Sequence, residues 1–297
     1  MKKIISLLFI IALTLLAACG GTEDTNGTDD STNKQEKNNK EETIVFGQTS
    51  WTSTEAPTQI AKQILEEAGY TVEISLLSQP LIFQGLQSEE IDFFMDAWLP
   101  YTEADLWEKY KDDLIKVTTS YENVPLGWVV PSYVKADSIA DIKGNAGKFG
   151  GKIYTISPGA GIVSISKEVI KDYNLDGFEL VPSSESAMVS VLDENIKNEE
   201  PVIITGWRPH SIFEKYDLKF LEEPKENFKS DNVYVVSYQG IKETHPEAYE
   251  ILSNWSIEVA DLEKIIYEYE NNGVSFEESA KQWIEEHREQ VDKMLEK

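Results

Sequence analysis

The sequence predicts an α/β fold of two lobes, each a mostly parallel sheet flanked by helices, with two hinge crossings between them. The chain has 297 residues, enough for two lobes of ordinary size. Short apolar runs alternate with segments of helical periodicity, and loops bearing Trp or Gly lie between them. Two apolar extended segments, 126–131 and 233–237, fall outside this alternation and are expected to be the crossings. The predicted lobes are 44–131 plus 236–297, and 132–235.

Residues 1–18 have the pattern of a secretion signal peptide. Lys2 and Lys3 precede an apolar run, 4–16, that ends in small residues. This run is too short to favour a lasting membrane-spanning helix. The Leu-Ala-Ala-Cys sequence ending at Cys19 resembles the lipobox of bacterial lipoproteins, in which the cysteine is acylated and becomes the first residue. We therefore expect lipidation at Cys19.

A polar segment follows the cysteine. Residues 20–43 include no apolar side chain larger than glycine, so they cannot form a core. As a flexible coil this segment would have an r.m.s. reach of about 27 Å, which suits a tether. We assign 19–43 to the lipidated cysteine and its disordered tether, and we expect the folded part to begin near Ile44.

The alternating pattern predicts strands that each lead through a loop into a helix. The expected strands are 44–47, 91–97, 152–156 and 201–205. The first helix should stop at Gly69, and the second should begin at Thr102 with Asp105 completing a variant capping box. The tail carries further helix signals, namely Thr244 before Pro246, Ser256 before Glu258, a stop at Gly273 and a capping box of Ser275 with Glu278. We expect the tail helices to pack on the first lobe.

Charge and composition exclude several classes of function. The chain has 27 basic and 53 acidic side chains, a formal charge of −26, whereas nucleic acid and anionic membranes are bound through clustered Lys and Arg. We therefore expect a small or cationic partner and no nucleic acid. Three histidines and one cysteine give no spacing for a zinc site, so neither metal nor cofactor is expected.

The seven tryptophans divide into two groups. Four lie among apolar neighbours in predicted helices or strands and are assigned to the core: Trp107, Trp128, Trp255 and Trp283. Trp51, Trp98 and Trp207 each follow a predicted strand, among small or polar neighbours. In open parallel sheets the ligand lies beyond the carboxyl ends of the strands, so we expect these three to face a ligand.

Converging indole rings form a site for a quaternary ammonium group, because each ring face attracts a cation by about 0.5 to 2 kcal/mol. A carboxylate would attract sodium as well. Sodium holds its water tightly, whereas a trimethylammonium group loses little by shedding water. An aromatic cage therefore provides selectivity that a carboxylate alone does not.

The glycine-rich turn 157–162 opens a predicted helix. The backbone amides of Gly161 and Ile162 should point unpaired into the cleft at the positive end of that helix, which suits an anion. Glycines also occur in turns for purely conformational reasons. Together with a cation cage, however, these amides describe a site for a small zwitterion with a methylated nitrogen and a carboxylate.

The sequence resembles the glycine betaine-binding proteins of ATP-driven osmoprotectant importers, a family of quaternary ammonium solute-binding proteins, over nearly the whole chain from Ile44. The most specific motifs are Asp96-Ala97-Trp98-Leu99-Pro100, Pro158-Gly159-Ala160-Gly161-Ile162 and Thr205-Gly206-Trp207-Arg208-Pro209-His210. The resemblance implies a periplasmic-binding-protein-like fold that closes over its ligand, a cage of Trp51, Trp98 and Trp207, and a betaine carboxylate on the Gly161 and Ile162 amides. It further implies a non-enzymatic lipoprotein on the outer face of the cell membrane, with an ABC permease and ATPase as partners.

The chain departs from the family pattern at two positions. Some betaine-binding members carry a carboxylate-binding histidine where this chain has Glu103, so that role does not carry over. We expect Glu103 to lie in the first turn of the helix after Thr102, close to solvent. Choline-binding relatives carry an acidic residue where this chain has Ser53, which argues mildly against choline.

Two alternatives remain open. A binder of choline, carnitine or another methylated amine belongs to the same transporter class. A secreted glycoside hydrolase or lectin is more remote, because aromatic platforms with carboxylates such as Asp92, Asp96 and Glu103 also suit sugars. No pattern in the sequence fixes two of these carboxylates across one bond.

Overall fold

The computed structural model describes residues 42–296. The predicted signal peptide, Cys19 and nearly all of the tether lie outside the described residues. The first strand begins at Thr43, one residue before the expected start of the folded part. Within 42–296, no helix has the length and apolar character needed to cross a bilayer.

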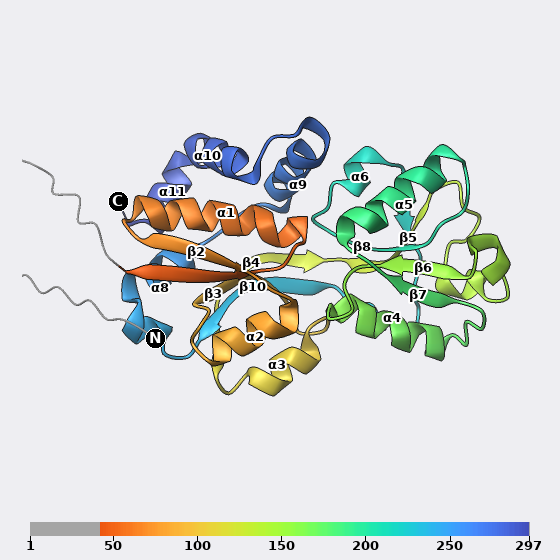
Figure 1. The fold of residues 1–297 in the computed structure, drawn as a ribbon, viewed down its shortest axis with the longest axis horizontal. Helices are drawn as coiled ribbons and strands as arrows, with labels where there is room; N and C mark the ends of the chain where they lie inside the picture. Colours follow the sequence, from red (N-terminus) through yellow and green to blue (C-terminus); the bar gives the residue numbers. More distant parts are fainter. Residues whose placement is uncertain (1–41, 297) are drawn as a thin grey trace, which may run out of the picture. The chain divides into compact units, whose positions relative to one another are not determined.

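Two five-stranded sheets form the framework of the two lobes (Figure 1). The first sheet has the order β2-β1-β3-β10-β4, and the second has the order β7-β6-β8-β5-β9. The strands of the first sheet are β1 (Thr43–Gln48), β2 (Thr71–Leu76), β3 (Phe93–Leu99), β4 (Leu114–Val124) and β10 (Asp231–Tyr238). Those of the second are β5 (Leu126–Pro131), β6 (Lys152–Thr155), β7 (Glu179–Pro182), β8 (Ile204–Trp207) and β9 (Leu218–Phe220).

The two sheets share one pattern of strand directions. In the first, β2, β1 and β3 run parallel, β10 is antiparallel to β3, and β4 is antiparallel to β10. In the second, β7, β6 and β8 run parallel, β5 is antiparallel to β8, and β9 is antiparallel to β5. Each sheet is mixed, with a single strand reversed. The predicted α/β fold of two mostly parallel sheets is therefore confirmed.

The reversed strands are the two segments that the sequence predicted to be crossings. β5 belongs to the second sheet, although its residues were expected in the first lobe, and β10 belongs to the first sheet. The chain therefore passes between the sheets just before Leu126 and again between β9 and Asp231. The lobe limits expected at 131 and 235 stay a prediction. The sheet memberships of β5 and β10 favour limits closer to the N-terminus.

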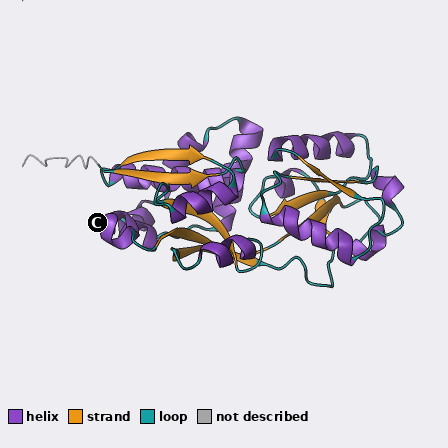
Figure 2. Cartoon of the chain, turned by 60° about the horizontal axis from the view of Figure 1, so that its bottom comes forward, coloured by secondary structure: helices purple, strands orange, loops and turns teal. Residues whose placement is uncertain are grey.

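Helices cover both faces of each sheet (Figures 1 and 2). Those of the first lobe are α1 (Thr52–Glu67), α2 (Gln79–Gln87) and α3 (Ala104–Tyr110). Those of the second are α4 (Gly161–Asp172), α5 (Glu185–Lys197) and α6 (Ile212–Lys215). The tail forms α7 (Ile241–Thr244), α8 (Pro246–Ser253), α9 (Val259–Tyr267), α10 (Phe276–Glu286) and α11 (Arg288–Met294).

The tail helices pack on the first lobe, as the sequence predicts. Gln63 on α1 donates to the backbone oxygen of Glu277 at 2.7 Å. Ser275 caps α10 by accepting the Glu278 amide at 3.2 Å, and Gly273, with a φ of 70°, ends the preceding turn. Ser256 is not a cap, because α9 begins only after Glu258. The tail therefore adds a helical layer that holds α1 against the first sheet.

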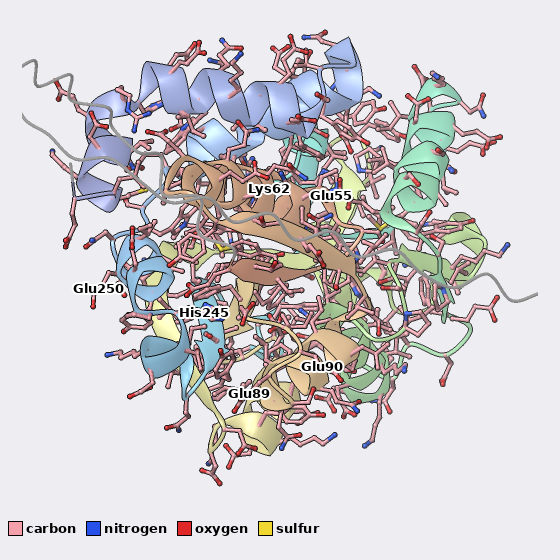
Figure 3. The ribbon with its side chains drawn as sticks, turned by 60° about the vertical axis from the view of Figure 1, so that its left-hand side comes forward. Glu55, Lys62, Glu89, Glu90, His245 and Glu250 are labelled. Atoms are coloured by element: carbon pink, nitrogen blue, oxygen red, sulfur yellow. The ribbon has the colours of Figure 1, made fainter. Side chains whose placement is uncertain are left out.

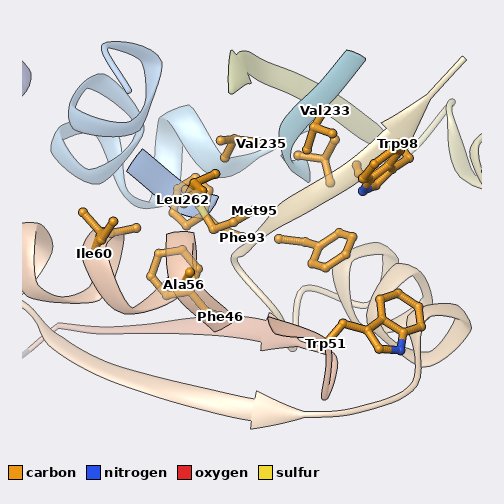
Figure 4. Close-up of a cluster of buried hydrophobic side chains, with 14 of the residues drawn as sticks. Phe46, Trp51, Ala56, Ile60, Phe93, Met95, Trp98, Val233, Val235 and Leu262 are labelled. Carbon is orange, nitrogen blue, oxygen red and sulfur yellow. The ribbon is translucent and has the colours of Figure 1, made fainter. Parts of the chain in front are cut away.

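Three of the four tryptophans assigned to the core are buried, and the fourth packs against its edge. Trp128 is fully buried in the second lobe, where its indole donates to the Ser166 hydroxyl at 2.9 Å. Trp255 and Trp283 are buried, and Trp107 is half-buried against the first-lobe core. Figure 4 shows part of that core.

Candidate functional site

The strand order places the candidate residues at equivalent points of the two sheets. In the first sheet β1 is followed by β2 on one side, and the chain then returns to β3 on the other. β6, β7 and β8 repeat this arrangement in the second sheet. Connections that leave neighbouring strands in opposite directions open a crevice at the carboxyl ends, where ligands bind in open α/β sheets.

One cavity gathers residues from the carboxyl ends of β1, β3, β6 and β8 and from adjoining segments. The lining residues are Trp51, Ser53, Gln79, Asp96, Trp98, Thr102, Glu103, Leu126, Ile156, Ala160, Gly161, Ile162 and Trp207. The structure therefore brings together every ligand-facing residue that the sequence singled out, although their roles remain predictions.

Trp51, Trp98 and Trp207 are all buried, with exposed fractions of 5 to 7%. Trp51 immediately precedes α1, Trp98 lies near the end of β3, and Trp207 is the last residue of β8. Trp98 and Trp207 are thus strand residues, because β3 and β8 extend further towards the C-terminus than the expected strands. Figure 4 shows the Trp51 and Trp98 rings at the same end of the first-lobe core.

Asp96 is a buried carboxylate in the lining of the cavity. Its Oδ1 accepts the Trp98 indole N–H at 2.8 Å and the Tyr121 hydroxyl at 3.3 Å. Its Oδ2 accepts the Thr54 hydroxyl at 2.7 Å and the Ser53 hydroxyl at 3.3 Å. Burial raises the pKa of Asp96, and these four donors oppose the rise by stabilising the charged form.

The hydrogen bonds of Asp96 determine which kind of cation its carboxylate can attract. Two donors occupy each oxygen, so no lone pair remains to replace the hydration shell of a sodium ion. The negative charge still attracts a cation that keeps no water, such as a quaternary ammonium group. A carboxylate bonded in this way is compatible with selectivity for a weakly hydrated cation over a metal ion.

Ser53 joins the two lobes beside the cage. The indole N–H of Trp207, from the second lobe, donates to the Ser53 hydroxyl at 3.2 Å, and that hydroxyl also contacts Asp96. Ser53 therefore fixes the ring of Trp207 relative to that of Trp98. This explains structurally why a small polar residue occupies the position.

Gly161 and Ile162 form the other end of the cavity as the first residues of α4. The turn before them is held by a 3.1 Å bond from the Ala160 amide to the Ser157 oxygen. The Val163 amide then donates to the Ala160 oxygen at 3.1 Å. The amides of Gly161 and Ile162 are the first two of α4, at the positive end of the helix, where backbone N–H groups have no intrahelical partner.

Three polar side chains line the cavity beside these amides. Gln79 Oε1, Thr102 Oγ1 and Glu103 Oε2 are buried and have no hydrogen-bond partner among the described residues. Gln79 also donates its amide to the other oxygen of Glu103. Buried polar atoms are usually paired, so three unpaired atoms in one cavity indicate where a polar ligand group belongs.

The expectation that Glu103 lies near solvent is wrong. Its exposed fraction is 2%, and α3 begins only at Ala104, so Thr102 does not cap that helix. The Glu103 amide donates to the Trp98 oxygen at 3.1 Å, and the Thr102 amide is held by the Asp231 carboxylate at 2.8 Å. With one local bond and one that spans 129 residues holding this segment, the Glu103 side chain lies in the lining of the cavity.

The surroundings of Glu103 favour the protonated form of its side chain. Burial raises its pKa well above the usual range, and the negative charges of Asp96 and Asp231 raise it further. A protonated carboxyl group donates a hydrogen bond and does not repel an anion. In its protonated form the Glu103 side chain has a proton to donate into the cavity. Sequence reasoning missed this role because it depends on burial.

The carboxylates considered for a sugar-active protein do not gather at one place. Asp96 and Glu103 line the cavity, but both oxygens of Asp96 are occupied by donors. Asp92 is absent from the lining and instead accepts the Val45 amide at 2.7 Å. This arrangement does not favour the sugar-active alternative.

Two mixed sheets with a buried cavity at their facing strand ends define a two-lobed solute-binding protein. Comparison with known proteins identifies its family: the substrate binding domain of ABC-type glycine betaine transport systems matches residues 42–286, and the chain belongs to this family. The resemblance seen in the sequence is thereby confirmed.

Solved structures and a curated relative support this assignment. Lactococcal OpuAC, closed on glycine betaine, has a TM-score of 0.82 and 34% identity, covering 86% of this chain and 100% of that one. The ProX protein of Borrelia burgdorferi has a TM-score of 0.82 and 29% identity, covering 84% and 96%. The glycine betaine/carnitine transport binding protein GbuC of Listeria monocytogenes is 40% identical over 141 residues, 46% of this chain and 47% of its own. The match spans about half the length of that relative.

Proposed function

We propose that this protein captures glycine betaine, or a similar betaine, outside the cell and delivers it to an ABC importer for osmoprotection. One observation carries the proposal: a single buried cavity is lined by three tryptophans and the Asp96 carboxylate, and also by the helix-start residues Gly161 and Ile162 and the Glu103 carboxyl group. This chemistry matches a small zwitterion at both of its ends.

The cation end is formed by Trp51, Trp98 and Trp207 around the trimethylammonium group. Each ring contributes about 0.5 to 2 kcal/mol, with the larger values applying in a dry site. Asp96 supplies a formal negative charge below the rings, and its four donors keep it fixed. The cage discriminates against hydrated metal ions, and Asp96 strengthens attraction to a weakly hydrated cation.

The anion end is formed by the Gly161 and Ile162 amides and the Glu103 carboxyl group. A carboxylate accepts two charge-assisted bonds from the amides, whereas the hydroxyl group of choline accepts one neutral bond. This difference is worth about 2 kcal/mol, roughly thirtyfold in favour of betaine. Uncharged Glu103 adds a donor for a carboxylate.

Carnitine is the second candidate, because it carries a hydroxyl group in addition to a quaternary nitrogen and a carboxylate. The unpaired Gln79 Oε1 and Thr102 Oγ1 could accept that hydroxyl proton. The relative GbuC is named for both glycine betaine and carnitine. Choline lacks the carboxylate for which the anion end is suited.

The proposal also includes the site of action. Lipidation of Cys19, with 20–43 as a tether, would hold the folded domain at the outer face of the membrane. The permease and ATPase of an ABC importer would then receive the ligand. The family to which the chain belongs is defined by this type of transport system.

A calorimetric titration of the protein with glycine betaine, proline betaine, carnitine and choline tests the proposal. We expect betaines to bind tightest and choline about thirtyfold more weakly. Trp98→Ala should weaken every ligand, because all four share the quaternary nitrogen, and Trp283→Ala serves as the control. Choline binding as tightly as betaine would reject the assigned ligand, and no binding of any of the four would reject the class.

A further inference from the structure

Glu185, the first residue of α5 in the second lobe, makes two hydrogen bonds to the first lobe. Its Oε2 accepts the backbone amide of Thr52 at 2.9 Å, and its Oε1 accepts the Thr52 hydroxyl at 2.7 Å. Thr52 begins α1 and directly follows Trp51. The Glu185 carboxylate thus binds the positive end of α1, one residue from the cage.

His210 connects the same carboxylate to the cage residue of the second lobe. Its Nδ1 accepts the Ile212 amide at 3.3 Å, so the ring proton resides on Nε2, which lies 3.1 Å from Glu185 Oε1. The His210 ring meets the Trp207 ring edge to face, with centroids 5.0 Å apart. Both Glu185 and His210 are buried.

The surroundings of this contact are acidic. Glu55 on α1 (Figure 3) lies close enough to Glu185 for their charges to interact, and Glu270 from the tail binds the Ser211 hydroxyl. Burial raises the pKa of Glu270, and the positive charge of Lys215 opposes that rise. His210 and Lys215 are the basic groups that face this acidic cluster. The pairing of Glu185 with Thr52 and His210 offsets the repulsion between Glu185 and the neighbouring carboxylates.

We propose that Thr52, Glu185 and His210 form an inter-lobe contact that exists only in the closed protein and holds Trp51 and Trp207 in position around the ligand. Glu185 is a positioning residue in this proposal, because it touches the neighbours of the cage residues and does not line the cavity. The proposal rests on the proposed function of the cavity.

A metal centre is the competing explanation. Oxygens of Glu185 and Glu270 and a nitrogen of His210 lie within 4.8 Å of one another, and His210 Nε2 has no hydrogen bond of good geometry among residues 42–296. Both Glu185 oxygens, however, already accept bonds from Thr52, and Glu270 accepts one from Ser211. The inter-lobe contact therefore accounts for these groups without a metal ion.

The inter-lobe contact predicts a particular kinetic effect. Because it forms after the ligand has entered and the lobes have closed, its loss should speed ligand dissociation and leave association almost unchanged. A residue that only stabilised the second lobe would instead lower the melting temperature of the unliganded protein. The two rates and the melting temperature therefore distinguish the roles.

The test uses stopped-flow tryptophan fluorescence with glycine betaine on Glu185→Gln, Thr52→Val and the double variant. We expect Glu185→Gln to speed dissociation at least tenfold and Thr52→Val by less, with the double variant no faster than Glu185→Gln alone. Thr52→Ser, which keeps the hydroxyl group, should dissociate like the wild type. Glu194→Gln, on the exposed side of the same helix, is the matched control.

Several outcomes would overturn the proposal. Unchanged dissociation in Glu185→Gln, or additive effects of the two substitutions, would show that the residues do not act together. Tighter binding with added zinc, or weaker binding with a chelator, would indicate a metal centre. If the wild type binds no betaine, the proposed function fails and the inter-lobe contact fails with it; wild-type binding with normal Glu185→Gln kinetics rejects only the contact.

Discussion

The start of α4 rests directly on the backbone of Thr102. A Cβ atom placed on Gly161 would lie 2.8 Å from the carbonyl carbon of Thr102 and even nearer to its oxygen. Gly161 belongs to the second lobe and Thr102 to the first, so the absence of a side chain at Gly161 permits the lobes to meet. The amides that suit the ligand carboxylate thus lie where the lobes touch.

Gly161→Ala should prevent full closure and weaken glycine betaine binding by at least a hundredfold, while the unliganded protein keeps its melting temperature. The added methyl group meets backbone atoms, which cannot move aside as a flexible side chain can. Gly147→Ala is the control, because a Cβ there has no neighbour within 4 Å. Calorimetry and thermal unfolding measure both effects, and normal affinity in Gly161→Ala would contradict the closed arrangement.

Trp51→Ala, Trp98→Ala and Trp207→Ala should each weaken betaine binding by about 1 to 3 kcal/mol, roughly five- to 150-fold. Each removes one ring from the cage. Trp283→Ala should leave affinity unchanged, because that ring binds Asp261 in the tail, away from the cavity. Equal, small losses of affinity at all four positions would mean that the cage is wrongly assigned.

Betaine affinity should fall as pH rises through the raised pKa of Glu103. Below that pKa the neutral side chain donates to the ligand carboxylate, and above it the ionised side chain repels the carboxylate. Glu103→Gln keeps a donor and cannot ionise, so its affinity should vary little between about pH 5 and about pH 9. Choline, with no carboxylate, should not lose affinity with the wild type at high pH. A flat profile for wild-type betaine binding would show that Glu103 does not face the ligand.

Glu55 should make the protein less stable as pH rises. Burial and the charge of Glu185 raise its pKa to about 7. Its favourable contribution to folding is complete below its ordinary pKa of 4.5 and is lost as pH approaches about 7. Glu55→Gln should therefore raise the melting temperature more at about pH 8 than at about pH 3.5, where the side chain is mostly protonated in both states. Glu250→Gln, at an exposed position, is the control, and an equal shift at both pH values would refute the assignment.

Cys19→Ala should move the protein from the membrane fraction to the medium without changing its affinity for betaine. A diacylated cysteine carries two chains, enough for stable attachment, and the substitution removes the acylation site. Immunoblots of the two fractions provide the measurement. Retention of the variant in the membrane fraction would reject lipidation at this position.

The sequence predicts the features that follow from local order along the chain. Trp51 and Gly161 each lie at the start of the helix that follows a strand, so alternation alone places them at the carboxyl edges of the sheets. The reversed strands β5 and β10 were recognised as exceptions, but their sheets were not predictable. Which sheet a strand joins depends on pairing partners far away in the sequence.

The carboxylates show the limit of such reasoning most clearly. Glu103 has the local features of an exposed first-turn residue, yet its amide donates to the Trp98 oxygen, the Asp231 carboxylate holds the neighbouring Thr102 amide, and its side chain lines the cavity. The pair of Thr52 and Glu185 is separated by 133 residues and carries no local signal. Burial and protonation of acidic groups arise from such long-range contacts, which periodicity does not encode.

The most direct test of the proposed site compares glycine betaine with 3,3-dimethylbutanoate, in which carbon replaces the quaternary nitrogen and the shape and carboxylate are kept. A cage that acts through cation–π attraction and the charge of Asp96 should bind this anionic analogue, whose tert-butyl group carries no positive charge, at least a hundredfold more weakly. Calorimetric titration of the wild-type protein with both compounds measures this ratio. Affinities within about threefold of each other would show that the tryptophans bind shape and apolar surface only, and would contradict the proposed recognition of a quaternary ammonium ion.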